Sequence, residues 1–225
     1  MKNKLLIAGV LIVSAFFLQS CGNANNSTHK NDMDTSTQHM DKKDTMNSGK
    51  MQMGNDMMKS MNHSMDKMHD MKMTGDFDLD FAHMMIIHHQ AAIEMSEVEI
   101  AKGTDAQITT MAKNIVTAQK NEIEQLQQFI TNNKIPEAKT KMDEMHHQLS
   151  ETMKAMMVKM NNMQMTGNTD KDFVMMMIPH HESAVTMAKD ELTHGKQPGL
   201  KKMAQKMIAD QTKEINELKA WSSMQ

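Results

Sequence analysis

A long internal repeat limits what this chain can fold into. At an offset of 92 residues, the segment Met61–Phe129 aligns with Met153–Trp221 without a gap. The pattern Met-x-Met-Thr-Gly occurs at 71–75 and again at 163–167, and each is followed at the same distance by an Asp-Phe pair. A gapless repeat of this length is typical of two copies of one structural unit, each covering the apolar face of the other.

Each copy has the pattern of two helices joined by a short turn. Apolar residues recur at helical spacing, a glycine follows each run, and a second apolar run begins almost at once. The expected boundaries are N-caps at Asp78 and Asp170, helix ends at Gly103 and Gly195, and second helices starting at Thr104 or Asp105 and at Pro198.

These elements predict an all-α fold. Because the turns are short, consecutive helices should be antiparallel, and each copy should form an αα-hairpin. Two hairpins bury their apolar faces by pairing into a four-helix bundle, either within one chain or across a homodimer. A further helix with methionines along one face precedes each hairpin, so the predicted domains are repeat 1 at 57–132 and repeat 2 at 138–225.

The N-terminus has the pattern of an export signal. Lysines precede an apolar run at residues 5–17, which is too short to span a bilayer. The following Leu-Gln-Ser-Cys resembles a bacterial lipobox, and this resemblance implies a lipid on Cys21; the alternative is an ordinary secretory signal with a free cysteine. We therefore expect a signal peptide at 1–20, a flexible Met- and His-rich tether at 21–56, and a lipoprotein of the cell envelope, periplasmic or on the outer face of a membrane.

Methionine dominates the composition, with 32 of 225 residues. A single cysteine excludes an intramolecular disulfide framework and any multi-cysteine metal site, and the formal charge of -3 gives no basic footprint for nucleic acid. Several methionines lie in the tether, where there is no core to fill: Met33, Met40, Met46, Met51 and Met53. Thioether is a soft, neutral ligand that suits Cu(I) and Ag(I) rather than Mg²⁺ or Ca²⁺.

A duplicated set of methionines and histidines is the candidate metal site. Met84, His88 and Met95 share one face of a predicted helix, with His89 at its edge. The candidate ligands from both copies are Met84, His88, His89, Met95, Met176, His180, His181 and Met187. Two alternatives remain open: methionines that only fill a core with satisfied interior histidines, and Cu(II) or Ni(II) on His88/His89 and His146/His147. Glu122 and Glu214 either hold the imidazoles or face solvent.

The same residues carry a family resemblance. The sequence Met-Ile-Pro-His-His at 177–181, the Asp-Phe pairs and the Gln-x-x-Glu-Ile elements resemble a bacterial family long described as a domain of unknown function, which is associated with ferritin-like helical bundles and periplasmic copper binding (CopM-like proteins). The first copy departs from the pattern with Ile87 in place of Pro179. The resemblance covers 78–130 and 170–221, and it implies a ferritin-like bundle, bound copper and the same eight ligands.

The sequence thus predicts a non-enzymatic, lipid-anchored protein that binds copper, Cu(I) in preference to Cu(II), with Ag(I) as a second soft ion. Its expected roles are sequestration, tolerance or delivery, with a copper donor or acceptor protein and the membrane as partners. Two competing hypotheses are a structural bundle that binds a protein through a Met-rich face and a metal oxidase on a ferritin-like scaffold. Histidine ligands must be neutral to bind, so affinity is expected to fall as the pH drops through about 6.5.

Overall fold

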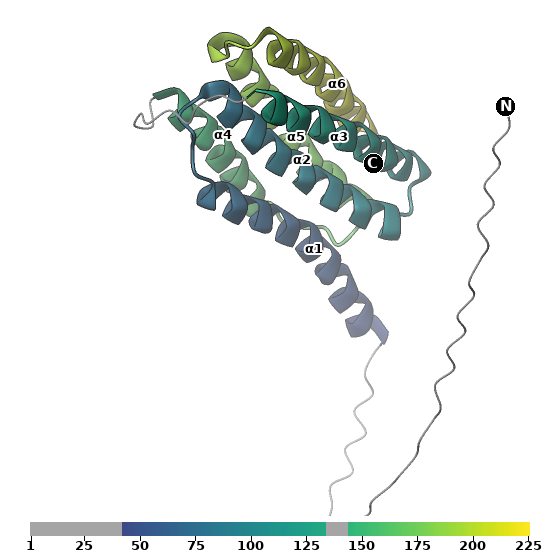
Figure 1. Cartoon of the computed structure of the whole chain (residues 1–225). Helices are drawn as coiled ribbons and strands as arrows, with labels where there is room; N and C mark the ends of the chain where they lie inside the picture. The colour runs from purple at the N-terminus through teal and green to yellow at the C-terminus, as the bar shows by residue number, and fades with distance from the viewer. Residues whose placement is uncertain (1–41, 134–143) are drawn as a thin grey trace, which may run out of the picture. The chain divides into compact units, whose positions relative to one another are not determined.

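The structure is a computed structural model that describes residues 42–133 and 144–225. These ranges contain helices and no strand, as predicted (Figure 1). The helices are α1 (Lys42–Asp70), α2 (Phe77–Lys102), α3 (Ala106–Asn132), α4 (Glu144–Asn161), α5 (Thr169–His194) and α6 (Pro198–Ser222). Helix α1 begins inside the segment that the sequence assigned to the tether. The predicted signal peptide and Cys21 lie outside the described residues.

The two hairpins are α2–α3 and α5–α6, and they meet along α2 and α5 (Figure 1). Helix α1 packs on α2, and α4 packs on α5, so each hairpin carries its Met-rich helix on the outside. Phe81 and its repeat counterpart Phe173 are fully buried. Thioethers fill much of the remaining core, so core filling does explain many methionines, including Met57, Met61, Met85, Met95, Met160 and Met176.

The N-caps of α2 and α5 differ from the prediction. They are Asp76 and Asn168, two residues before the predicted aspartates, and their side chains accept hydrogen bonds from Leu79 N and Lys171 N. Asp78 and Asp170 lie in the first helical turn instead. The prediction was wrong because both aspartates are used elsewhere in the fold.

Asp78 and Asp170 join the two repeats to each other. Asp170, on α5, accepts hydrogen bonds from the backbone of Thr104 and Asp105 in the turn of the first hairpin, each at 2.9 Å. Asp78, on α2, accepts hydrogen bonds from the backbone of Lys196 at 3.0 Å and from the next residue at 2.8 Å, in the turn of the second hairpin. The contacts are reciprocal, so each hairpin turn is held by a buried carboxylate of the other hairpin.

The predicted helix ends and restarts are confirmed. Asp105 caps α3 by accepting hydrogen bonds from two backbone N–H groups, and Pro198 is the first residue of α6. Gly103 ends α2 with a φ of -65°, so no left-handed conformation requires glycine there. The requirement is space, because a Cβ atom on Gly103 would overlap the carboxyl group of Glu99; Gly195 and Glu191 repeat this arrangement.

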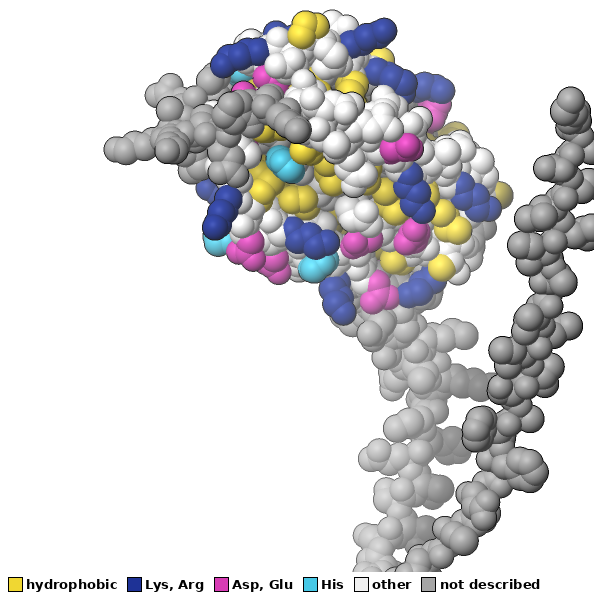
Figure 2. Space-filling model, in the orientation of Figure 1, with side chains coloured by type: hydrophobic (Ala, Val, Ile, Leu, Met, Phe, Trp, Pro, Cys, Tyr) yellow, Lys and Arg dark blue, Asp and Glu magenta, His cyan; other side chains and the backbone are white. Residues whose placement is uncertain are grey.

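The described surface carries little apolar material. On the face in Figure 2, lysine and acidic side chains are interspersed, with apolar side chains between them. Among the described large hydrophobic residues, Val158 and Met224 are the exposed ones, at 63% and 68%. Other methionines in 56–133 and 147–225, among them Met65, Met68, Met71 and Met73, are half-buried. No helix in the described part of the chain is both long and apolar enough to span a bilayer.

Candidate metal centre

Two histidines meet where the hairpins pair. His88 extends from α2 and His180 from α5, and their ring centroids lie 3.7 Å apart with the planes tilted by 33°. Both side chains are buried, at 1% exposure. Helix α5 continues through Pro179, which precedes this histidine. The repeat therefore brings the first histidine of each His-His pair to one place in the bundle.

A serine connects this histidine pair to a thioether. The Ser183 hydroxyl lies 2.8 Å from His88 Nε2, 3.0 Å from Met156 Sδ and 2.7 Å from the His180 carbonyl oxygen. The sequence analysis named neither Ser183 nor Met156 as a candidate ligand. The repeat gave no signal for either residue, because Ala91 and Ser64 occupy the corresponding positions in the first copy.

Burial keeps the two histidines neutral. It lowers the pKa of His88 and of His180 well below 6.5, and the neighbouring histidines lower both values further. His88 Nδ1 and both ring nitrogens of His180 have no side-chain hydrogen-bond partner. A neutral imidazole carries a proton on one ring nitrogen and a lone pair on the other, so each of these histidines can offer one nitrogen to a metal ion. Protons therefore compete only weakly for these ring nitrogens near pH 6.5.

The second histidine of each pair faces its own hairpin. His89 Nε2 lies 2.8 Å from Glu122 Oε2 on α3, and His181 Nε2 lies 2.9 Å from Glu214 Oε2 on α6. Both rings are fully buried. Each glutamate therefore lies beside the second histidine of its own hairpin, where it could hold the imidazole.

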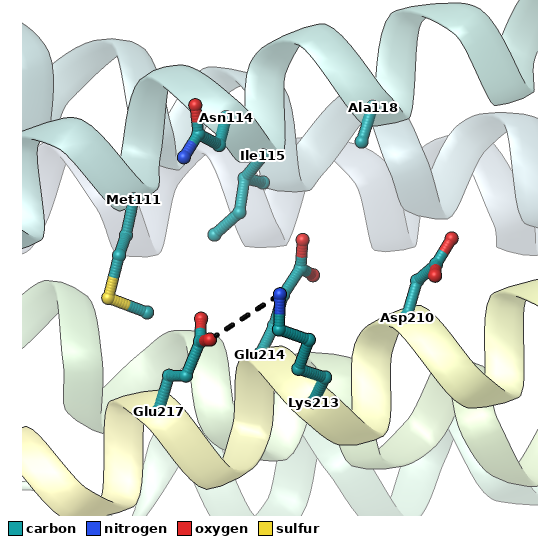
Figure 3. Close-up of a pocket in the computed structure, with 8 residues that line it drawn as sticks. All are labelled: Met111, Asn114, Ile115, Ala118, Asp210, Lys213, Glu214 and Glu217. Carbon is teal, nitrogen blue, oxygen red and sulfur yellow. Dashed lines mark ion pairs between the residues drawn. The ribbon is translucent and has the colours of Figure 1, made fainter.

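A groove between α3 and α6 leads to one of these glutamates. Figure 3 shows Met111 and Ile115 on the α3 side, facing Glu214 and the ion-paired Lys213 and Glu217 on the α6 side. The side chain of Glu214 is 19% exposed, whereas that of Glu122 is 8% exposed. The carboxylate that holds His181 therefore has the better contact with solvent.

The predicted methionine ligands are buried but do not all gather at the histidines. Met95, Met176 and Met187 are fully buried, and Met84 is 3% exposed. Met84 lines a pocket with thioethers of α1 and α4, and no residue of the His-His pairs lines that pocket. The structure thus brings His88 and His180 together, whereas Met84, one helical turn before His88, lines this other pocket.

The residues that the structure describes form no carboxylate-rich site. Among the described residues, no group of three or more His, Cys, Asp or Glu side chains is arranged to hold a metal ion. Glu191 is followed by His194 in the Glu-x-x-His spacing that di-iron bundles use, but it interacts with Asp78 of the other repeat. This arrangement does not supply the ligands of a di-iron centre.

Two segments of the chain match a known protein family. Residues 17–130 and 78–222 both match the family described as Domain of unknown function (DUF305). The chain belongs to this family. Two solved DUF305 structures share its fold: one from Streptomyces coelicolor (22% identity, 64% of this chain and 90% of that chain, TM-score 0.51) and a fragment from Deinococcus radiodurans (16% identity, 66% and 97%, TM-score 0.50).

Other similar proteins include one solved with metals. CopM in the Cu(I)-bound form is 31% identical over 65% of this chain and 95% of that chain, with a TM-score of 0.49. Uncharacterized protein L153 of Acanthamoeba polyphaga mimivirus is 43% identical over 49 residues, which cover 22% of this chain and 32% of that protein. The chain therefore spans about a third of this curated relative.

Proposed function

We propose that this DUF305 protein binds Cu(I) and Ag(I) as cargo, with the His88–His180 pair as the central site. One observation carries the proposal: two buried imidazoles, whose pKa values burial lowers, lie against each other, and His88 Nδ1 and both ring nitrogens of His180 have no side-chain partner. The Met156 thioether, linked to His88 through Ser183, supplies a soft ligand beside them. Imidazole and thioether together suit Cu(I).

The remaining predicted ligands have separate roles in this proposal. His89 and His181, each held by a glutamate, keep their rings fixed behind the central pair. The buried thioethers of Met95, Met176 and Met187 are additional candidate ligands along the same two helices. The protein is a non-enzymatic binder in this proposal, and it sequesters the ion or passes it to an acceptor protein.

The test removes the central imidazoles without opening a cavity. A His88→Leu/His180→Leu variant should lose about one equivalent of Cu(I) per chain against a competing chelator, because leucine fills the space but cannot bind the ion. The measurement is metal-resolved mass spectrometry under reducing conditions. Cu(I), Ag(I) and Zn²⁺ are offered together, so that the preference for soft ions is measured in the same sample.

The matched control is His63→Leu/His83→Leu, which removes two histidines outside the candidate sites, one exposed and one half-buried. It should retain the full metal content. An unchanged copper count in the His88/His180 variant would show that the pair is not a binding site.

We also propose that the protein is exported and anchored by a lipid on Cys21. A Cys21→Ser variant should move from the membrane fraction to the soluble fraction of the cell envelope, because a serine cannot accept the thioether-linked lipid. Immunoblotting of the two fractions measures this. If the variant stays with the membrane, the anchor is not at Cys21.

A further inference from the structure

A pocket that no residue of the histidine pairs lines is formed mainly by sulfur. It has a volume of about 330 Å³ and lies among α1, α2, α4 and the loop that joins α1 to α2. Its thioethers are those of Met65, Met68, Met71, Met73, Met84 and Met153. Its other lining residues are His69, Ser150 and Lys154. No carboxylate lines it, so it offers nothing to a hard divalent cation.

The pocket is not an ordinary piece of core. Met65 and Met68 are only half-buried, whereas their repeat counterparts Met157 and Met160 are buried. The same helix positions therefore pack closed in one repeat and leave accessible sulfur in the other. A core that needed only apolar volume would bury both copies alike.

The pocket is larger than a single ion, so the ligands must move to enclose one. Methionine has three rotatable side-chain bonds, and the half-buried thioethers of α1 and its following loop have room to turn inward. Met84 and Met153, at 3% and 2% exposure, form the buried part of the lining. The charge of Lys154 is compensated by Glu151, whose carboxylate lies 2.7 Å from its Nζ.

We propose that this thioether pocket is a second binding site for a soft monovalent ion, Cu(I) or Ag(I), coordinated by sulfur alone and independent of the histidine pair. This proposal rests on the proposed function, because both sites would bind the same ions, Cu(I) and Ag(I). Thioether carries no proton at any relevant pH, so the ion at this site has no competition from protons. Its ion is therefore retained in acid.

The test compares two triple variants of the full chain. Met65→Leu/Met68→Leu/Met73→Leu removes three pocket sulfurs, and Met157→Leu/Met160→Leu/Met165→Leu removes their repeat counterparts. Leucine keeps the helix and the apolar volume. By native mass spectrometry with Ag(I), the pocket variant should bind about one ion fewer than the wild type, and the counterpart variant should bind the wild-type number. Circular dichroism checks that both fold.

A third variant separates this site from the proposed function. His88→Leu/His180→Leu should keep the pocket ion at pH 4, and its Cu(I) X-ray absorption spectrum should show sulfur neighbours without nitrogen. An unchanged Ag(I) count in the pocket variant, or an equal loss in both triple variants, overturns the proposal and leaves an apolar cavity. If the pocket variant keeps its metal but His88→Leu/His180→Leu loses one equivalent of Cu(I), the proposed function stands without the pocket. If only the pocket variant loses an ion, the pocket is a site and the histidine pair is not.

Discussion

Replacing Asp170 with alanine should lower the free energy of unfolding of the metal-free protein by about 3 kcal/mol. Its buried carboxylate accepts three hydrogen bonds, from the backbone N–H groups of Thr104 and Asp105 and from the Thr104 hydroxyl, at 2.8 to 2.9 Å. Alanine would leave these donors, at the start of the other repeat's second helix, without an acceptor. An unsatisfied buried donor costs more than the hydrogen bond itself contributes.

The reciprocal variant, Asp78→Ala, should have a smaller effect in the same direction, because Asp78 accepts hydrogen bonds only from the backbone of Lys196 and Gln197. Asp66→Ala, at an exposed position on α1, is the control and should change stability by less than about 0.5 kcal/mol. Urea unfolding followed by circular dichroism measures all three. A loss in Asp170→Ala no greater than in the control would mean that the carboxylate does not hold the repeats together.

These aspartates also show where sequence reasoning stops. The repeat, the helical spacing and the short turns were enough to predict two hairpins and their pairing. Local pattern placed the N-caps at Asp78 and Asp170, because an aspartate at the start of an apolar run usually caps its own helix. A local pattern carries no information on a turn in the other repeat. Thr104, which Asp170 contacts, lies 66 residues away in the sequence. The actual caps, Asp76 and Asn168, lie just outside the run.

For the candidate site too, the sequence predicted which way some side chains point but not which residues they contact. The helical projection correctly placed His88 and His89 in different directions, because successive residues differ by about 100° around a helix. It did not say which neighbour each would meet. Ser183 and Met156 were missed because the repeats differ at these two positions, and a search for duplicated residues cannot find a contact that occurs once. Met84 was grouped with His88 by helix face, but α1 and α4 give it other neighbours.

The largest pH effect on the metal-free protein should come from two other buried side chains, Glu99 and Glu191. Burial raises the pKa of Glu99 to about 8 and that of Glu191 to about 9, from 4.5, and the adjacent Asp170 and Asp78 raise them further. In the folded protein both carboxyl groups keep a proton that the unfolded chain releases near pH 4.5. Their contribution to stability is therefore complete below pH 4.5 and is lost as the pH rises toward 8 and 9.

A Glu99→Gln/Glu191→Gln variant should isolate this effect, because glutamine resembles the protonated acid, still offers a donor to the neighbouring aspartate and does not titrate. Each glutamate contributes a slope of up to about 1.4 kcal/mol per pH unit, so the wild type should lose stability between pH 5 and 9 much more steeply than the variant. The control is Glu97→Gln, at an exposed position on the same helix as Glu99. Its stability should vary with pH as that of the wild type does. Urea unfolding at several pH values gives the slopes. If the two carboxyl groups hold protons in the folded protein, the free energies of unfolding of the wild type and the double variant should converge at low pH, and the variant should be the more stable of the two at pH 9. Parallel plots of unfolding free energy against pH would show instead that both carboxyl groups are already ionised in the folded protein.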